Sequence, residues 1–294
     1  MKKSIKFLAS SITAILFIGS IALVSCVKDG QVINNEHHVS SFKSSGNSPF
    51  DYIGETHNQL LSLIGTEIEN DITDFVNLKY KTEESRDSLI EKIVNVAPHI
   101  VKEIVFADMT MSEIEDLFES TYIAAEQDEY VLSEVAIEIK KIFDRYQGVS
   151  DLDELQLDIR MTELDMVNRE MSAIDSQIVA CLNVYYHSLN FWRDATFNEG
   201  NPWHMLLDDI NNNPDSYLFN TSKRPKIKEW FKKAEEWLHD TYQHIEEKYT
   251  WRNIGRADLY GAGLGVDLAL HTPAGANAII ISAVAMSTVG PLFM

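Results

Sequence analysis

The sequence predicts an all-α protein: a multi-helix bundle with one long, heptad-patterned helix and a C-terminal αα-hairpin of small residues. Three observations support this prediction. Apolar residues recur at steps of three and four along most of the chain, as on the buried face of a helix. No run alternates apolar and polar residues with period two, the pattern of a half-buried strand. Near the C-terminus, small residues recur at intervals of four, which lets two helices pack closely.

The composition indicates a folded body with a strongly acidic surface. The 294 residues are 45% hydrophobic and include only 7 Pro and 13 Gly, which argues against disorder. The net charge is -20, and because residues 1–25 hold three lysines and no acid, the chain without them carries -23. Such a surface repels phosphate backbones, so a nucleic acid is not expected as a partner. The simplest role of the acids is to keep a secreted protein soluble.

The N-terminus has the pattern of a secretory signal: a basic start, an apolar run from Phe7 to Val24, and the residues Leu23-Val24-Ser25-Cys26. These last four residues resemble the lipobox of bacterial lipoproteins. The resemblance implies that residues 1–25 are a signal peptide and that Cys26 is acylated. Lipid on Cys26 would anchor the protein in the cell envelope, and we expect the outer membrane. An ordinary signal peptide with an incidental cysteine is the alternative.

A flexible tether is expected at residues 26–48, because its polar, Ser-, Asn- and Gly-rich sequence has no periodicity and a reach of about 25 Å. His37 and His38 lie in it and are interpreted as solvated. The helical domain is expected at 49–294, with the small-residue hairpin at 252–294. Cys181 is the only other cysteine, so acylation of Cys26 leaves no intramolecular disulfide.

The first helix is expected to start at Ser48 and Pro49, with Asp51 in a capping box, and to close at Gly65. His57 lies on its apolar stripe and is interpreted as a buried, hydrogen-bonded structural histidine rather than a ligand. The segment 54–58, "GETHN", together with the lipobox and the Gly/Ala-rich apolar C-terminus, resembles an uncharacterised group of lipoproteins from Bacteroidota. That resemblance implies no activity.

Further helical stripes follow at 68–76, 89–97, 112–122 and 132–146. Pro98 is expected to break or kink the second of these, and Ser112 with Glu115 to form a capping box for the third. The longest helix is expected from Ser150 to Ala195, because its apolar positions from Leu164 onward follow a heptad. Its seam suits an intramolecular bundle or a dimer, and the other apolar helices favour the bundle.

Residues 197–225 are expected to be mostly loop, with room for a helical turn near 204–210, because Gly and Pro interrupt them. After Pro225, aromatic and aliphatic residues recur at helical spacing as far as Tyr249. Tryptophans at this spacing are interpreted as core rather than as a binding site.

The tail is expected to form two packed helices. The positions with small side chains in the first arm are Ala257, Gly261, Gly265 and Ala269, and Thr272-Pro273 starts the second arm. We expect the hairpin to be buried in the bundle, because Asp258 and Asp267 interrupt the first arm and a carboxylate inside a membrane costs about 3 kcal/mol or more. Insertion into a membrane, or release from the folded body, is the alternative.

Three short sequence patterns resemble metal or nucleotide sites, and each lacks a residue or spacing that such a site needs. Asp209, Asn211, Asn213 and Asp215 alternate like the first ligands of a calcium loop, but Pro214 stands where that loop needs glycine. A turn that caps its own backbone explains the same residues, so no metal is assigned. Glu236 and His239 have the spacing of a di-iron helix, but a second copy is missing. Residues 260–265, "YGAGLG", lack the glycine spacing of a dinucleotide loop.

The sequence therefore assigns no catalytic residue and no cofactor. The first hypothesis is a non-enzymatic binding or structural lipoprotein, held at the membrane by Cys26, that presents an acidic helical surface to a protein partner. The alternative is a membrane-active or self-associating protein that acts through its C-terminal hairpin. A hydrolase or metalloenzyme without a recognisable motif is the third hypothesis, because the 45 acids allow many carboxylate pairs.

Overall fold

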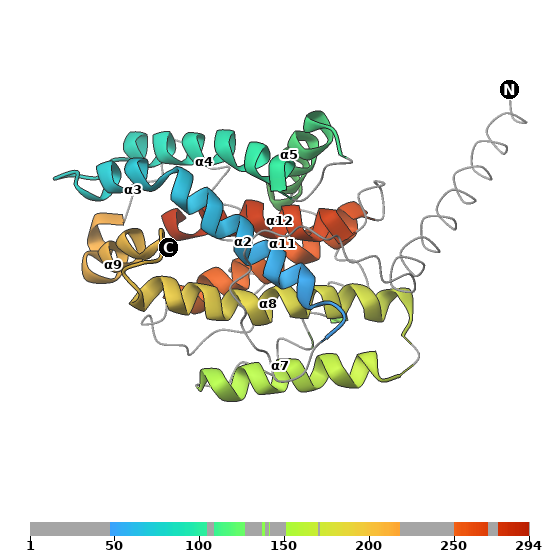
Figure 1. Cartoon of the computed structure of the whole chain (residues 1–294). Helices are drawn as coiled ribbons and strands as arrows, with labels where there is room; N and C mark the ends of the chain where they lie inside the picture. Colours follow the sequence, from blue (N-terminus) through green and yellow to red (C-terminus); the bar gives the residue numbers. More distant parts are fainter. Residues whose placement is uncertain are drawn as a thin grey trace, which may run out of the picture.

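The computed structural model describes residues 48–104, 109–126, 137–138, 141, 151–169, 171–217, 250–269 and 276–293. In these ranges the chain forms helices and no strand, which confirms the all-α, multi-helix prediction (Figure 1). Cys26 and the tether as far as residue 47, most of the stripe at 132–146 and the aromatic stripe at 227–249 lie outside the described residues. So do Glu236 and His239.

The first two helices are α2 (Asp51–Glu67) and α3 (Glu69–Val76). Gly65 does not end α2, contrary to the prediction. The missing side chain of Gly65 instead lets Trp203 pack against α2, because a Cβ there would lie 2.5 Å from the indole nitrogen of Trp203. The capping box is half formed: the backbone N–H of Ser48 donates to Asp51 Oδ2 (3.0 Å), but Phe50 takes the N-cap position.

The helices α4 (Glu83–Ile104) and α5 (Met111–Glu126) follow. Helix α4 runs through Pro98, so the helix does not break there. Pro98 is buried, and the contacts of α4 with α2, α3, α5 and α12 hold the helix together. The cap of α5 lies two residues earlier than predicted. The backbone N–H of Thr110 donates to Glu113 Oε2 (2.7 Å), and the N–H of Glu113 donates to the Thr110 hydroxyl (3.3 Å).

The long heptad helix is in fact two helices, α7 (Leu152–Val167) and α8 (Ala173–Phe197). The physical reason is a strong start signal inside the predicted helix: Ser172 and Asp175 form a complete capping box, and each side chain accepts the other's backbone N–H. From Ile178 to Trp192 the heptad residues of α8 are nevertheless buried, including Cys181, whereas Ile174 in the first turn is exposed. The seam therefore packs within the bundle.

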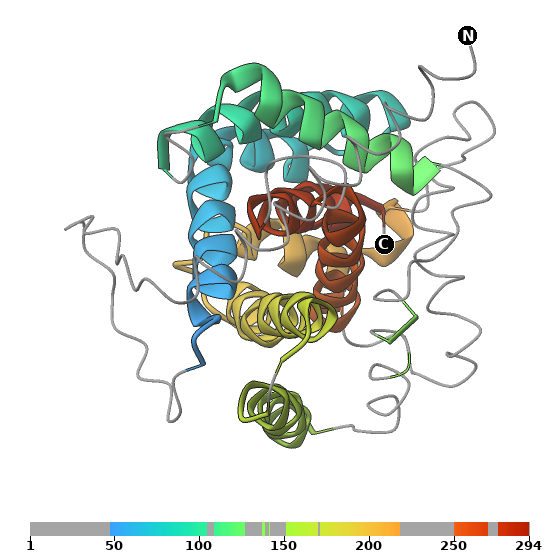
Figure 2. The same ribbon diagram turned by 90° about the vertical axis from the view of Figure 1, so that its right-hand side faces the viewer.

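The predicted loop after α8 contains α9 (His204–Asn212) and a short 3-10 helix, Pro214–Tyr217. The hairpin arms are α11 (Thr250–Ala269) and α12 (Ala276–Val289), with the 3-10 turn Gly290–Phe293 after them. Helix α12 occupies the centre of the bundle, where α2, α4, α5, α8 and α11 all contact it (Figure 2). Every residue from Ala278 to Val289 is buried, which confirms that the apolar tail is core.

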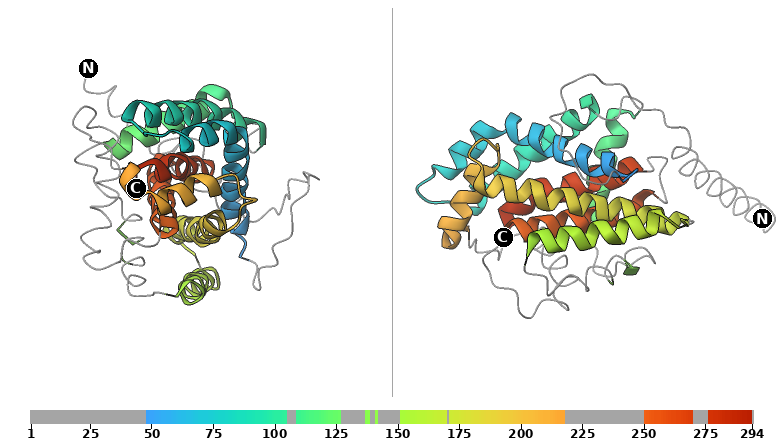
Figure 3. Two further views of the ribbon diagram at one scale, coloured as in Figure 1. Left: turned by 90° about the vertical axis from the view of Figure 1, so that its left-hand side faces the viewer. Right: turned by 60° about the horizontal axis from the view of Figure 1, so that its bottom comes forward.

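The helix α7 lies at the edge of the molecule, separated from the hairpin by α8 (Figures 2 and 3). Among the described helices it packs mainly on α8. The side of α7 that faces the bundle is buried and the opposite side is exposed to solvent, so α7 forms one edge of the bundle.

Candidate functional site

The GETHN segment of α2 lies against α8, and two of its residues, Gly54 and Asn58, hydrogen-bond to that helix. The backbone N–H of Gly54 donates to Asn183 Oδ1 (3.0 Å), and Asn58 Nδ2 donates to the carbonyl of His187 (2.9 Å). A Cβ on Gly54 would lie 2.5 Å from the His187 ring and 2.6 Å from the carbonyl oxygen of Asn183. Glycine is therefore required for this close approach of two helices.

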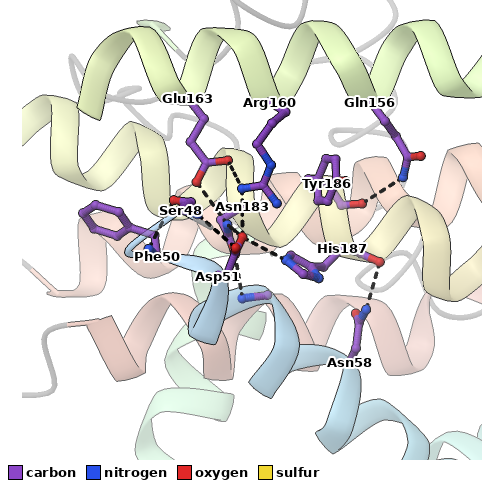
Figure 4. Close-up of polar contacts among 11 residues, drawn as sticks. Ser48, Phe50, Asp51, Asn58, Gln156, Arg160, Glu163, Asn183, Tyr186 and His187 are labelled. Atoms are coloured by element: carbon purple, nitrogen blue, oxygen red, sulfur yellow. Dashed lines mark hydrogen bonds and ion pairs between the residues drawn. The ribbon is translucent and has the colours of Figure 1, made fainter. Parts of the chain in front are cut away.

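Beside Gly54, a polar cluster that we call the clamp joins α2, α7 and α8 (Figure 4). Its members are Ser48, Asp51, Arg160, Glu163, Asn183 and His187. Arg160 Nη1 contacts Asp51 Oδ1 at 2.8 Å and Glu163 Oε2 at 2.7 Å. Asn183 Nδ2 donates to both carboxylates, at 3.0 and 3.1 Å. The clamp thus ties the peripheral helix α7 to two helices of the bundle.

The two carboxyl groups of the clamp differ in their proton affinity. Burial acts to raise the pKa of Asp51, but hydrogen bonds from His187 and Asn183 and the Arg160 guanidinium outweigh burial and hold that pKa well below its usual range. Burial dominates at Glu163 and raises its pKa, although Ser48, Arg160 and Asn183 oppose it. Asp51 therefore carries the negative charge that balances Arg160, while Glu163 is the group that takes up a proton more readily.

A second polar cluster, the core network, lies where α2, α8, α11 and α12 meet. It consists of His57, Ser188, Trp192, Asp258 and Ser287, and all five side chains are 0% exposed or nearly so. Trp192 Nε1 donates to Asp258 Oδ2 at 2.8 Å, and the hydroxyls of Ser188 and Ser287 also bond this carboxyl group. His57 Nε2 lies 3.0 Å from Ser287 Oγ.

The core network contains Ser, His and Asp, but its order is not that of a hydrolase triad. In a triad the histidine stands between the serine and the carboxylate. Here Ser287 stands between the other two, and His57 Nε2 is 3.8 Å from Asp258 Oδ2. Because the serine is also fully buried, no substrate reaches it in this conformation. The network is therefore a structural element of the core, and the prediction for His57 as a buried, hydrogen-bonded residue is confirmed.

The hydrogen bonds and the burial of His57 and Asp258 determine the electrostatics of the core network. Asn58 directs its amide nitrogen to His187, so its oxygen faces His57 Nδ1 (3.1 Å) and requires a hydrogen on that ring nitrogen. The other ring nitrogen, Nε2, lies 3.0 Å from Ser287 Oγ, and the Ser287 hydroxyl donates to Asp258 Oδ1. Burial raises the pKa of Asp258 to about 7, although the hydrogen bonds from Ser188, Ser287 and Trp192 act to lower it, and burial lowers the pKa of His57 to about 4.

The calcium candidates lie at the end of α9 and in the 3-10 helix after it, not in a binding loop. The Asp209 carboxylate is bonded to Lys81 (2.8 Å), Asn213 (2.9 Å) and the Tyr217 hydroxyl (2.5 Å). Burial acts to raise the pKa of Asp209, but Lys81 and Tyr217 lower it overall. Across the described ranges, no three His, Cys, Asp or Glu side chains lie close enough to share a metal ion.

The small residues of the hairpin make the close packing that their spacing predicts. A Cβ on Gly261 would lie 2.5 Å from the Ser282 carbonyl oxygen, and one on Gly265 would lie 2.5 Å from that of Ala278. Ala269, at the end of α11, is only half-buried. The two glycines therefore set the distance between α11 and α12.

Sequence reasoning missed most of the buried polar residues. Asp51 was interpreted only as a capping residue, and Arg160, Glu163, Asn183 and His187 were not singled out. A usable signal existed for Asp258, which stands four residues after Ile254 and three before Gly261 and so lies on the small-residue face. A charge on a face that must be buried indicates a polar partner in the core.

No protein family model, curated protein or solved structure matches this chain. The likeness to Bacteroidota lipoproteins therefore stays a prediction from the leader, the GETHN segment and the tail. Within the described residues, no helix combines the length and apolar character needed to cross a membrane.

Proposed function

We propose that this chain is a lipid-anchored protein of the cell envelope with a non-enzymatic binding or structural role. One observation supports the proposal. Among the described residues, the polar side chains that come together in clusters bond to one another where helices pack. The clamp joins α2, α7 and α8, and the core network joins α2, α8, α11 and α12. The surface left for interaction is helical and acidic, which suits recognition of another protein.

The anchor in this proposal is lipid on Cys26, placed by the lipobox-like sequence before it. Residues 26–48, expected from the sequence to form a flexible tether with a reach of about 25 Å, would then connect the membrane to the bundle. Acyl chains contribute about 0.8 kcal/mol for each buried methylene, so the lipid holds the body at the membrane without a spanning helix. We propose the outer membrane as the location.

The alternative, a membrane-active or self-associating protein, requires the hairpin to leave the bundle. The burial of α12 against five other helices supports the first proposal, because removing it would expose the apolar core. Deleting residues 271–294 separates the two: loss of the cooperative thermal transition supports the binding or structural role. An intact fold that no longer contacts liposomes would support the alternative.

The anchoring is tested in cells fed an alkyne-labelled fatty acid. We expect the wild-type protein to carry the label and to sediment with outer membranes on a density gradient. The variant Cys26→Ser should lose the label and the membrane fraction, whereas the matched control Cys181→Ala should keep both, because Cys181 is buried in α8. Labelling that survives Cys26→Ser, or membrane association without any label, would contradict lipid anchoring at this residue.

A further inference from the structure

One face of α7 points away from the bundle and is unusual in composition. Glu154, Leu157, Met161 and Asp165 recur at steps of three and four, so they lie along one face of the helix, which we call the outer face. Leu157 is 61% exposed and Met161 is 59% exposed, and both acids are exposed too. The apolar residues that face α8 and the bundle instead are buried: Leu155, Ile159 and Met166.

The outer face has no positive charge of its own. The only basic residue of α7 is Arg160, which turns inward, is 8% exposed and is held by Asp51 and Glu163 of the clamp. An apolar pair is therefore bracketed by acids at both ends. The clamp also fixes α7 in position, so the face is presented with little loss of conformational entropy on binding.

Charge decides what such a face can bind. A second copy of this chain paired antiparallel through α7 would bring Glu154 of one molecule close to Asp165 of the other, and like charges would repel. An anionic lipid surface is disfavoured for the same reason. A segment with an apolar strip and flanking lysines or arginines complements both the apolar pair and the acids.

We propose that the outer face of α7 binds a cationic amphipathic helix of a partner protein or peptide. Its apolar side chains would cover Leu157 and Met161, and its basic side chains would face Glu154 and Asp165. From Glu154 to Asp165 the face is about 16 Å long, at 1.5 Å per residue, so a partner helix of about three turns matches it. This inference rests on the binding role proposed above and names the chemistry of the partner.

The test uses the acyl-free mature chain, residues 26–294 with Cys26→Ser, and a synthetic 14-residue helix with leucines on one face and lysines on the other. Binding is measured by titration calorimetry at low and high salt. We expect Leu157→Ser with Met161→Ser to weaken binding about tenfold, because the apolar contact is lost. Glu154→Gln with Asp165→Asn should weaken it about fivefold at low salt and much less at high salt.

The matched control neutralises two acids on α5, Glu115→Gln with Glu119→Gln, which are also exposed but have no exposed apolar pair between them. Affinity within about twofold of wild type is expected there. Equal weakening by the α5 and α7 variants would mean that net charge alone attracts the peptide, and would overturn the proposal. So would equally tight binding of a peptide with glutamates in place of its lysines.

The chain itself contains a basic segment that must be tested as a competitor for this face. Residues 223–233, outside the described part, contain six basic residues: Lys223, Arg224, Lys226, Lys228, Lys232 and Lys233. If replacing all six with Gln makes the peptide bind at least tenfold more tightly, the face is occupied within the chain and the proposal is wrong. The proposed anchoring fails separately, because it is read from acyl labelling, whereas this test uses a chain without lipid.

Discussion

The buried carboxyl group of Asp258 gives the most detailed prediction. Burial raises its pKa to about 7, whereas an exposed Asp in the unfolded chain has a pKa near 3.8. A group whose folded pKa is raised contributes stability that is present below the unfolded pKa and is lost as pH rises through the folded pKa. Ionisation of Asp258 therefore lowers the free energy of unfolding at neutral and alkaline pH.

The magnitude follows from the shift. A difference of about three pKa units corresponds to about 4 kcal/mol in the free energy of unfolding, at 1.36 kcal/mol per unit. The variant Asp258→Asn mimics the protonated acid, because its amide can donate to Ser287 while its oxygen accepts from Trp192. Relative to the wild type, Asp258→Asn should thus gain about 4 kcal/mol between pH 4 and pH 8.

The assay is urea unfolding of the acyl-free mature chain, followed by tryptophan fluorescence, at several pH values in that interval. His57 is present in both proteins; with its pKa lowered to about 4, its stabilisation is lost as pH falls below about 6.5. Glu119→Gln, on the exposed side of α5, should follow the wild type at every pH. A stability difference between Asp258→Asn and wild type that does not change with pH would refute the reasoning.

Three further predictions concern packing, the clamp and the calcium candidates. Gly265→Val should destabilise the fold by roughly 3 kcal/mol or more in urea unfolding, because its Cβ would lie 2.5 Å from the Ala278 oxygen. The control Gly263→Ala, with no atom within 4 Å of the new Cβ, should instead stabilise the fold by about 0.5–1 kcal/mol. Equal effects of the two variants would contradict the packing of α11 on α12. Asp51→Asn should lower the free energy of unfolding by about 3 kcal/mol at pH 7 and by less at pH 3 in the same assay. The reason is that the pKa of Asp51 is lowered in the folded state, so the stability that its ionised form contributes is lost as pH falls. A loss of stability that does not depend on pH would exclude the ion pair with Arg160. Millimolar calcium should leave the melting temperature unchanged within about 1 °C, because Lys81 and Tyr217 hold Asp209; a calcium-dependent rise would revive the calcium loop.

Periodicity was enough to predict the helices, the burial of His57 and the packed hairpin. These features depend on which face of a helix is apolar, and that is written in the spacing of residues such as Gly261 and Gly265. The break between α7 and α8 was missed because the heptad continues across it, and the cap formed by Ser172 and Asp175 outweighs the seam.

The clamp and the core network were beyond a periodicity argument, because each joins residues far apart in the sequence. Asp51 and Asn183 meet only after α2 packs on α8, and Asp258 meets Ser188 only after α11 does. Likewise, Pro98 ends a helix in isolation, but tertiary packing keeps α4 continuous. Local sequence thus predicts the elements, while the buried polar contacts between them follow from the assembled fold.

The burial of the apolar tail is tested most directly by hydrogen exchange, read by mass spectrometry, on the lipid-anchored protein in vesicles and on the acyl-free chain in solution. The backbone amides of Ala276–Val289 should be among the slowest to exchange in both samples, because α12 is the central helix of the bundle. Rapid exchange in solution that slows only when vesicles are present would contradict this account and assign the hairpin to the membrane.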